Sequence, residues 1–340
     1  MIHCAKYPVK NGKKVQDFLK KENLFHEVYK TVKKNSDLYS PLQSPHTSPL
    51  FELCEKPESF FPEKYSSQTL KSHVESILTP NEQKVFKRAF DVIGTIAILE
   101  IEPEIRPKEK EIGDIILKTH PSIKSVFRKD GSHQGDFRIQ PLVHVAGENT
   151  TITTHKENSV MIELDVSKVY FSPRLSNERL RIAKQVTPRE HILHMFSGCA
   201  PFECVIGKLA QPLAQIGIEL NPDGHTYGLK NIKKNKLSNI TLHCGDAKDI
   251  VEQMSQTFDR IVLNLPKSAY QFLPQALSVS KKGTILHYYD FLHEDDFERA
   301  KTRVKDACDE TEFTPKFLGI HTCGTQGVKT YRICVDILLQ

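Results

Sequence analysis

Four polar or flexible positions follow consecutive apolar runs in the second half of the chain, and their types suit an adenosyl ligand. Gly198 comes after "HILHMF", and Glu219 lies 21 residues later at the end of the run "QIGIEL". This spacing is typical of an acid that accepts hydrogen bonds from ribose hydroxyls. Asp246 follows "NITLHC" and Gly245, and its carboxylate can accept from an adenine amino group. Asn264 follows the next run, and its amide can donate and accept at once, as the edge of a base or an amine requires.

The residues after Gly198 distinguish two cofactors. A dinucleotide requires further glycines for close approach of the pyrophosphate. The chain instead has Cys199, Ala200 and Pro201, which favours S-adenosylmethionine. The alternative for Glu219 and Asp246 is that each acid merely caps a helix. The alternative for the Asn-Leu-Pro corner is a simple turn; otherwise Pro266 fixes this corner and begins the next helix.

Alternating strand and helix patterns place these residues at one edge of a sheet. Strand patterns cover 191–196, 215–220, 239–244, 260–265 and 283–289. Helical patterns cover 201–210, 223–236, 247–255, 268–279 and 294–309. This alternation predicts an α/β, Rossmann-like, mostly parallel sheet, with ligands at the carboxyl ends of its strands. Two last strands, 316–323 and 329–339, are joined by a short turn and should form an antiparallel final hairpin.

The first half of the chain is organised differently. Residues 1–57 predict a small α/β unit, followed by a Pro- and Ser-rich linker that leaves the boundary open within 41–67. Residues 67–186 mix a strand over 90–101 and a helix over 111–120 with further strands, which predicts an α+β central domain. The sheet domain then covers 187–340.

Composition and charge exclude several classes of protein. The chain has no run of apolar residues long enough for a membrane span and no Cys-x-x-Cys motif, so we expect no membrane and no metal site. Its eight cysteines are interpreted as reduced thiols of a cytoplasmic protein. Nine lysines against four acids make residues 1–40 basic, which suits a nucleic-acid backbone, although a solvated lysine-rich face is the alternative.

Several motifs, in order along nearly the whole chain, resemble the tRNA (guanine-37-N1)-methyltransferases of archaea and eukaryotes. They are "QGDFR" (134–138), "FSPRLSNERLRIA" (171–183), "IELNPDG" (218–224), "GDA" (245–247) and "NLPKSAYQFL" (264–273). The resemblance implies a class I, S-adenosylmethionine-dependent methyltransferase domain and a central domain. It also implies a small N-terminal domain that contacts the outer corner of tRNA. The implied reaction is methyl transfer to N1 of the guanine 3′ of the anticodon, in the anticodon stem-loop, by a monomer.

The resemblance also implies roles for individual residues. Arg138 matches an arginine that stabilises guanine O6, Glu178 matches the proposed general base, and Asn264 completes the catalytic set. Expected cofactor contacts are Phe196, Gly198, Glu219, Leu220, Asn221, Asp246, Ala247, Asn264 and Pro266. Expected substrate contacts are Arg138, Arg174, Pro266 and Lys267.

Each role has a structural alternative. Glu178 can instead form a surface ion pair with Arg174 or Arg181, at spacing i−4 or i+3, and Arg138 can form a structural ion pair. Three aromatic residues are candidates to stack on a splayed base, or else belong to the core: Tyr170, Phe171 and Tyr270.

Two departures from the family pattern bear on function. His194 stands where relatives have an acid, and Ala200 where they have a glycine, so a methyl group is added near the expected cofactor. Two alternative functions stay open. One is an enzyme of wyosine synthesis that transfers an aminocarboxypropyl group or methylates a wyosine intermediate. The other is an RNA-binding relative without catalysis.

Overall fold

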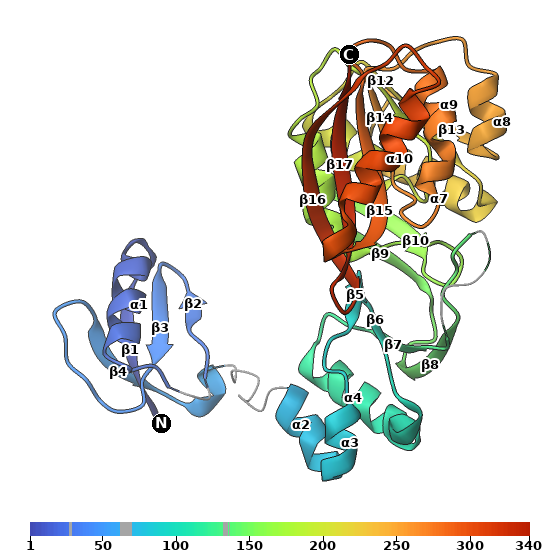
Figure 1. Ribbon diagram of the computed structural model, residues 1–340. Helices are drawn as coiled ribbons and strands as arrows, with labels where there is room; N and C mark the ends of the chain where they lie inside the picture. Colours follow the sequence, from blue (N-terminus) through green and yellow to red (C-terminus); the bar gives the residue numbers. More distant parts are fainter. Residues whose placement is uncertain (27–28, 62–69, 132–134, 136) are drawn as a thin grey trace. The chain divides into compact units, whose positions relative to one another are not determined.

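A computed structural model describes residues 1–26, 29–61, 70–131, 135 and 137–340. Gln134 and Asp136 of the "QGDFR" motif lie outside the described residues. The chain divides into two compact units (Figure 1), which are Met1–Arg88 with Lys118–His120, and Ala89–Leu117 with Pro121–Gln340. The three domain boundaries expected from the sequence stay predictions. Within the described part of the chain, no helix has the length and apolar character that crossing a bilayer requires.

The first unit contains an antiparallel sheet in the order β2-β3-β1-β4. Its strands are β1 (Ile2–Pro8), β2 (Val32–Lys34), β3 (Asp37–Pro41) and β4 (Glu52–Lys56). Its helices are α1 (Gly12–Lys21), α2 (Leu70–Ile77) and α3 (Pro80–Val85), with short 3-10 turns at Val9–Asn11 and Glu58–Phe60. Val15 and Leu19 are one helical turn apart in α1 and pack with Ala5 and Tyr7 of β1, so α1 covers one face of this sheet.

The second unit begins with a sheet in the order β5-β6-β7-β8, followed by a separate hairpin. The strands are β5 (Asp91–Ile93), β6 (Ile96–Leu99), β7 (Ser125–Lys129) and β8 (Leu142–Gly147), and the hairpin is β9 (Ile152–Glu157) with β10 (Val160–Asp165). The helices are α4 (Glu109–Thr119) and α5 (Ser176–Ala183), each preceded by a 3-10 turn, at Pro103–Lys108 and Pro173–Leu175.

The single strand predicted over 90–101 is instead two antiparallel strands, β5 and β6. The chain reverses at Gly94, whose φ of +56° is unfavourable for residues with a side chain. A β-carbon at Gly94 would also lie 2.2 Å from Oγ1 of Thr153, so no larger residue fits this turn. The apolar residues on both sides of Gly94 hide this break from a pattern-based prediction.

The rest of the second unit is the predicted α/β domain, a seven-stranded sheet in the order β13-β12-β11-β14-β15-β17-β16. The strands are β11 (His191–His194), β12 (Ala214–Glu219), β13 (Ile240–Cys244), β14 (Arg260–Leu263), β15 (Ile285–His293), β16 (Pro315–Gly327) and β17 (Thr330–Leu339). Strands β11 to β15 are parallel to one another, and β17 is antiparallel to both β15 and β16. The predicted fold class, including the antiparallel final hairpin, is therefore confirmed.

Helices cover both faces of this sheet (Figure 1). They are α6 (Pro201–Leu209), α7 (Pro222–Lys234), α8 (Ala247–Glu252), α9 (Leu273–Ser278) and α10 (Glu298–Cys308), with 3-10 turns at Ala269–Phe272 and Glu294–Asp296. Adjacent residues of β11 belong to two different cores: Ile192 packs with residues of α6 and α7, and Leu193 with residues of α8, α9 and α10. A strand buried on both faces is what a doubly wound sheet requires. The chain order reverses between β12-β11 and β14, which places the ligand-binding crevice at that point.

An ionic network joins α5 to strands β15 and β17 of the sheet. Arg181 pairs with Glu178 (Nε to Oε2, 2.8 Å) and with Asp336 on β17 (Nη1 to Oδ2, 2.5 Å). His287 on β15 lies 2.7 Å from the other carboxylate oxygen of Asp336. Burial would raise the pKa of Asp336, but hydrogen bonds from His287 and Arg181 outweigh it and lower that pKa well below its usual range. The network therefore keeps Asp336 charged inside the protein and fixes α5 on the sheet.

Candidate active site

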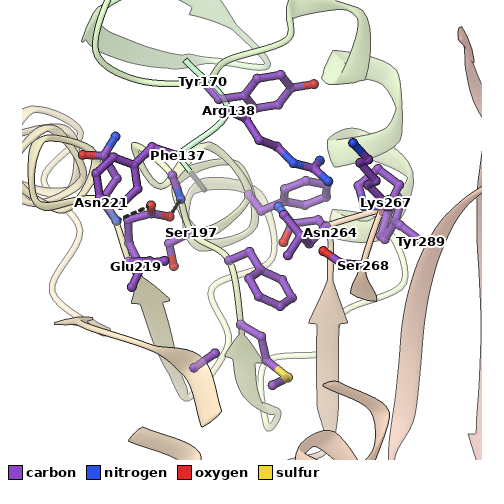
Figure 2. A pocket seen from close by; sticks show the side chains of 18 of the residues that line it. Phe137, Arg138, Tyr170, Ser197, Glu219, Asn221, Asn264, Lys267, Ser268 and Tyr289 are labelled. Carbon is purple, nitrogen blue, oxygen red and sulfur yellow. Dashed lines mark hydrogen bonds between the residues drawn. The ribbon is translucent and has the colours of Figure 1, made fainter. Parts of the chain in front are cut away.

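A cavity of about 710 Å³ lies at the carboxyl ends of the parallel strands, where the order of the sheet reverses. Most of the predicted site residues line it: Arg138, Phe196, Gly198, Glu219, Leu220, Asn221, Asp246, Ala247, Asn264, Pro266 and Lys267. Figure 2 shows Glu219 and Asn221 on one side of this cavity, while Arg138 extends from above toward Asn264 and Lys267. The cavity thus has an acidic end and a basic end.

Glu219 holds the glycine turn against the end of β12. Its carboxylate accepts hydrogen bonds from the N–H groups of Gly198 (2.5 Å) and Asn221 (2.8 Å). Asn221, and not Glu219, caps α7, because its side chain accepts from the N–H of Asp223. Burial raises the pKa of Glu219 and outweighs the two backbone hydrogen bonds, which lower it. The interpretation of Glu219 as a simple helix cap is therefore wrong.

Asp246 caps α8 and lines the cavity as well. One of its oxygens accepts from the N–H of Lys248 at 2.8 Å, so the helix-cap alternative describes it correctly. The same side chain is part of the cavity wall, beside Ala247. Because a carboxylate has two oxygens, capping leaves acceptor capacity for an adenine amino group.

The Asn-Leu-Pro corner directs an unsatisfied amide into the cavity. Oδ1 of Asn264 is buried and has no hydrogen-bond partner among the described residues. A buried acceptor without a partner costs free energy, which a bound donor recovers. Pro266 does not begin a helix as predicted. The N–H groups of Ser268 and Ala269 instead bond to the carbonyl of Leu265, which forms a turn before the 3-10 segment.

These features fit S-adenosylmethionine. Glu219 and Asp246, the two acids expected to hold the adenosine, both line the cavity, and Ser197 lies beside Glu219 (Figure 2). Asn264 lies toward Arg138 and Lys267, at the end where the methyl group would meet its acceptor (Figure 2).

Arg138 extends into the cavity, where it is half-buried (Figure 2). Its φ is +52°, and its N–H bonds to the carbonyl of Gly135, so a tight turn directs the side chain into the cavity. Among the described residues it forms no salt bridge, and the ion-pair alternative stays untested because Asp136 lies outside them. Burial, and then the positive charge of Arg332, lowers the pKa of Arg138, while Tyr170 opposes this shift.

Glu178 and Arg174 do not line the cavity. Glu178 is buried and forms the i+3 ion pair with Arg181, and it accepts a hydrogen bond from the hydroxyl of Tyr289 at 2.6 Å. Tyr289 does line the cavity, so it connects Glu178 to the site. Arg174 is exposed and pairs with Asp91 at 2.7 Å. The catalytic role of Glu178 and the substrate contact of Arg174 stay predictions.

The aromatic candidates differ in environment. Tyr170 and Phe171 both line the cavity, and Phe171 also packs against the core, with its ring centroid 5.1 Å from the Cζ of Arg179, as the core alternative expects. Tyr270 is 37% exposed and lies under the guanidinium of Arg303, 4.2 Å from the ring centroid, away from the cavity wall.

Sequence reasoning did not find Tyr289 and Arg332, which both line the cavity. Each lies within an apolar strand pattern that predicts core residues. One signal was available: Arg332, Cys334 and Asp336 alternate along β17 and pair with Phe291, Tyr289 and His287 on β15, so polar groups share one face of two buried strands.

Ala200 and His194 lie behind the site and do not line it. Ala200 is fully buried and has a left-handed backbone (φ +60°, ψ +41°) at the start of α6, where its methyl group faces Gly228 of α7. His194 is buried against Gln215 (3.0 Å), and burial lowers its pKa to about 4, so it is neutral.

We expect Ala200→Gly to stabilise the protein and to leave cofactor affinity almost unchanged. An alanine in the left-handed conformation destabilises the folded state by about 1–2 kcal/mol. Glycine avoids this cost, but roughly half of the gain is lost because glycine makes the unfolded chain more flexible. A thermal melt should therefore rise by about 2 °C, with the Kd for S-adenosylmethionine within about twofold of wild type. Ala210→Gly, at a φ of −105°, is the control and should destabilise. A tenfold change in Kd would show that the methyl group affects the ligand.

The sheet order and an adenosyl-sized cavity at the carboxyl ends of its strands define a class I methyltransferase. Two family profiles match the chain: the TRM5/TYW2 methyltransferase domain over residues 153–314 and the TYW2 N-terminal domain over residues 70–150. The chain is 33% identical to the tRNA (guanine(37)-N(1))-methyltransferase Trm5b of Pyrococcus abyssi, over 99% of its length and 98% of that protein. The chain therefore belongs to the TRM5/TYW2 methyltransferase family.

Two further comparisons distinguish branches of this family. The structure resembles that of aTrm5 in complex with tRNALeu, with a TM-score of 0.73, 30% identity and 99% of each chain covered. The chain is also 30% identical to the tRNA(Phe) (4-demethylwyosine(37)-C(7)) aminocarboxypropyltransferase of Pyrococcus horikoshii, but over 67% of its own length and 82% of that protein. The likeness to the guanine-37 enzymes is thus the more extensive one.

Proposed function

We propose that this protein transfers a methyl group from S-adenosylmethionine to N1 of guanine 37 in tRNA. The observation that carries this proposal is that the unsatisfied Asn264 amide and the Arg138 guanidinium face each other at one end of the cavity (Figure 2). The cavity accepts an adenosyl group at its acidic end and a base at its basic end.

The reaction needs one proton to leave and one negative charge to be stabilised. Guanine N1 carries a proton at neutral pH, and charge builds on O6 as that proton leaves. When bound, S-adenosylmethionine supplies an electrophilic methyl group. The N1 proton passes to the hydroxyl of Tyr289, which lines the cavity and gives its own proton to Glu178. Arg138 stabilises the charge on O6, and Asn264 holds the base edge for in-line attack.

A labelling assay with two tRNA transcripts tests this proposal. A transcript with guanine at the position 3′ of the anticodon should accept a labelled methyl group from S-adenosylmethionine. The same transcript with adenine there should stay unlabelled. Equal labelling of both would refute the assignment.

Mass spectrometry of the modified nucleoside separates the wyosine alternative. Methyl transfer and aminocarboxypropyl transfer add different masses, so a single digest distinguishes them. The 30%-identical aminocarboxypropyltransferase makes this measurement necessary. The observed opposition of Asn264 and Arg138 supports methyl transfer to a purine edge.

The basic first unit is proposed to contact the outer corner of tRNA. In support, Lys56 lies 5.4 Å from the ring centroid of Tyr39 and 5.5 Å from that of Phe60. Lysine beside aromatic rings suits phosphate together with bases. Contact with the anticodon stem-loop, action as a monomer and a cytoplasmic location complete the proposal.

A further inference from the structure

Arg332 lines the cavity together with Arg138, and contacts with neighbouring side chains orient its guanidinium. It lies on β17 opposite Phe291, with its Cζ 5.1 Å from the centroid of that ring. Its Nη2 donates to the hydroxyl of Tyr170 at 2.9 Å. Its Nε is buried and has no acceptor within the described residues. The guanidinium is therefore oriented but only partly satisfied.

In the described part of the cavity wall, no carboxylate pairs with Arg138 or Arg332. Burial lowers the pKa of Arg138, and the positive charge of Arg332 adds to this shift. Neither has a carboxylate within salt-bridge distance in the part of the chain that the structure describes. The acids of the cavity wall, Glu219 and Asp246, accept hydrogen bonds from backbone N–H groups instead. Two partly buried guanidiniums without a carboxylate are characteristic of an anion site.

We propose that Arg332 binds a phosphodiester of the RNA next to the target guanine, so that Arg138 remains available for O6. This inference rests on the proposed function. The base itself is neutral, whereas a nucleotide splayed into the cavity brings its flanking phosphate with it. The planar fork of arginine matches two phosphate oxygens, and the hydroxyl of Tyr170 keeps the fork oriented.

Salt dependence provides the test, because each lost phosphate contact reduces the slope of affinity against salt. In Arg332→Gln, KM for tRNA should rise about ten- to a hundredfold, and the slope of log kcat/KM against log salt should fall by about one. The kcat at saturation and the Kd for S-adenosylmethionine should stay within about threefold of wild type. Arg332→Lys keeps the charge and should keep the slope, with weaker binding.

Arg299→Gln is the matched control, since Arg299 is half exposed on α10, pairs with Asp296 and does not line the cavity. It should change neither KM nor slope. Circular dichroism and a thermal melt check that each variant is folded.

Three results would overturn the inference. An unchanged slope with a raised Kd for S-adenosylmethionine would assign Arg332 to the carboxylate of the cofactor. An unchanged slope with equal losses of kcat in Arg332→Gln and Tyr170→Phe would show that Arg332 only positions Tyr170. An unchanged slope, KM and Kd in a folded Arg332→Gln would show no ligand role. Failure of wild type to label the guanine transcript refutes the proposed function instead, and filter binding of tRNA still measures the slope.

Discussion

Arg138→Gln should lower kcat for guanine methylation by about two to three orders of magnitude, while the Kd for S-adenosylmethionine stays almost unchanged. The side chain enters the cavity from a left-handed turn and has no counter-ion there among the described residues. In a site of low dielectric its charge acts mainly on negative charge that develops at O6. Single-turnover methylation and calorimetry with the cofactor measure the two quantities.

Two variants control for other causes. Arg138→Lys keeps the positive charge but not the planar guanidinium with its paired N–H donors, so it should recover part of the rate. Arg189→Gln removes an exposed arginine that does not line the cavity, and it should retain wild-type kcat. An Arg138→Gln protein that is folded and methylates at the wild-type rate would exclude a catalytic role.

Glu178→Gln is expected to lower kcat at least a hundredfold, because the N1 proton then has no carboxylate to receive it. Hydrogen bonds from Arg181 and Tyr289 outweigh burial, which alone would raise the pKa of Glu178, and so lower that pKa. The carboxylate is therefore ionised throughout the neutral range, and its titration should not appear in the pH profile of single-turnover methylation there.

The same change tests stability. Because folding lowers the pKa of Glu178, its charge stabilises the folded state above the unfolded pKa of about 4.3, and this contribution is lost as pH falls through the folded pKa. Denaturant unfolding should show Glu178→Gln about 3 kcal/mol less stable at neutral pH, with a smaller difference in acid. Tyr289→Phe keeps the ion pair and removes only the link to the cavity. Full activity of folded Glu178→Gln would reduce its role to that ion pair.

The sheet and most of its edge could be predicted because local patterns specify them. Parallel strands buried on both faces read as short apolar runs, and each run ends near a residue that lines the cavity, as Glu219 and Asn264 do. The family motifs then identified Arg138, which lies far from these residues in sequence. The fold brings such residues, distant in sequence, into the wall of one cavity.

Other features could not be predicted, because tertiary contacts decide them. Both Arg174 and Arg181 are spaced to reach Glu178, and the choice of Arg181 depends on Asp336, 155 residues further on. The exclusion of Ala200 from the cavity depends on its packing against α7. Arg332 faces ligand space only because β17 lies between β15 and β16.

The place of β17 in the sheet also constrains how the protein is made. Strand β16 leaves the ribosome before the strand that joins it to the rest of the sheet, so β15 and β16 expose unpaired edges until residues 330–339 emerge. Unpaired edges invite pairing with other chains, which makes this interval the one most open to aggregation. Arg181 and His287 lack their partner Asp336 during this time, so the ionic network forms only after β17 has emerged. The nascent domain thus completes its sheet and its buried charges in one final event.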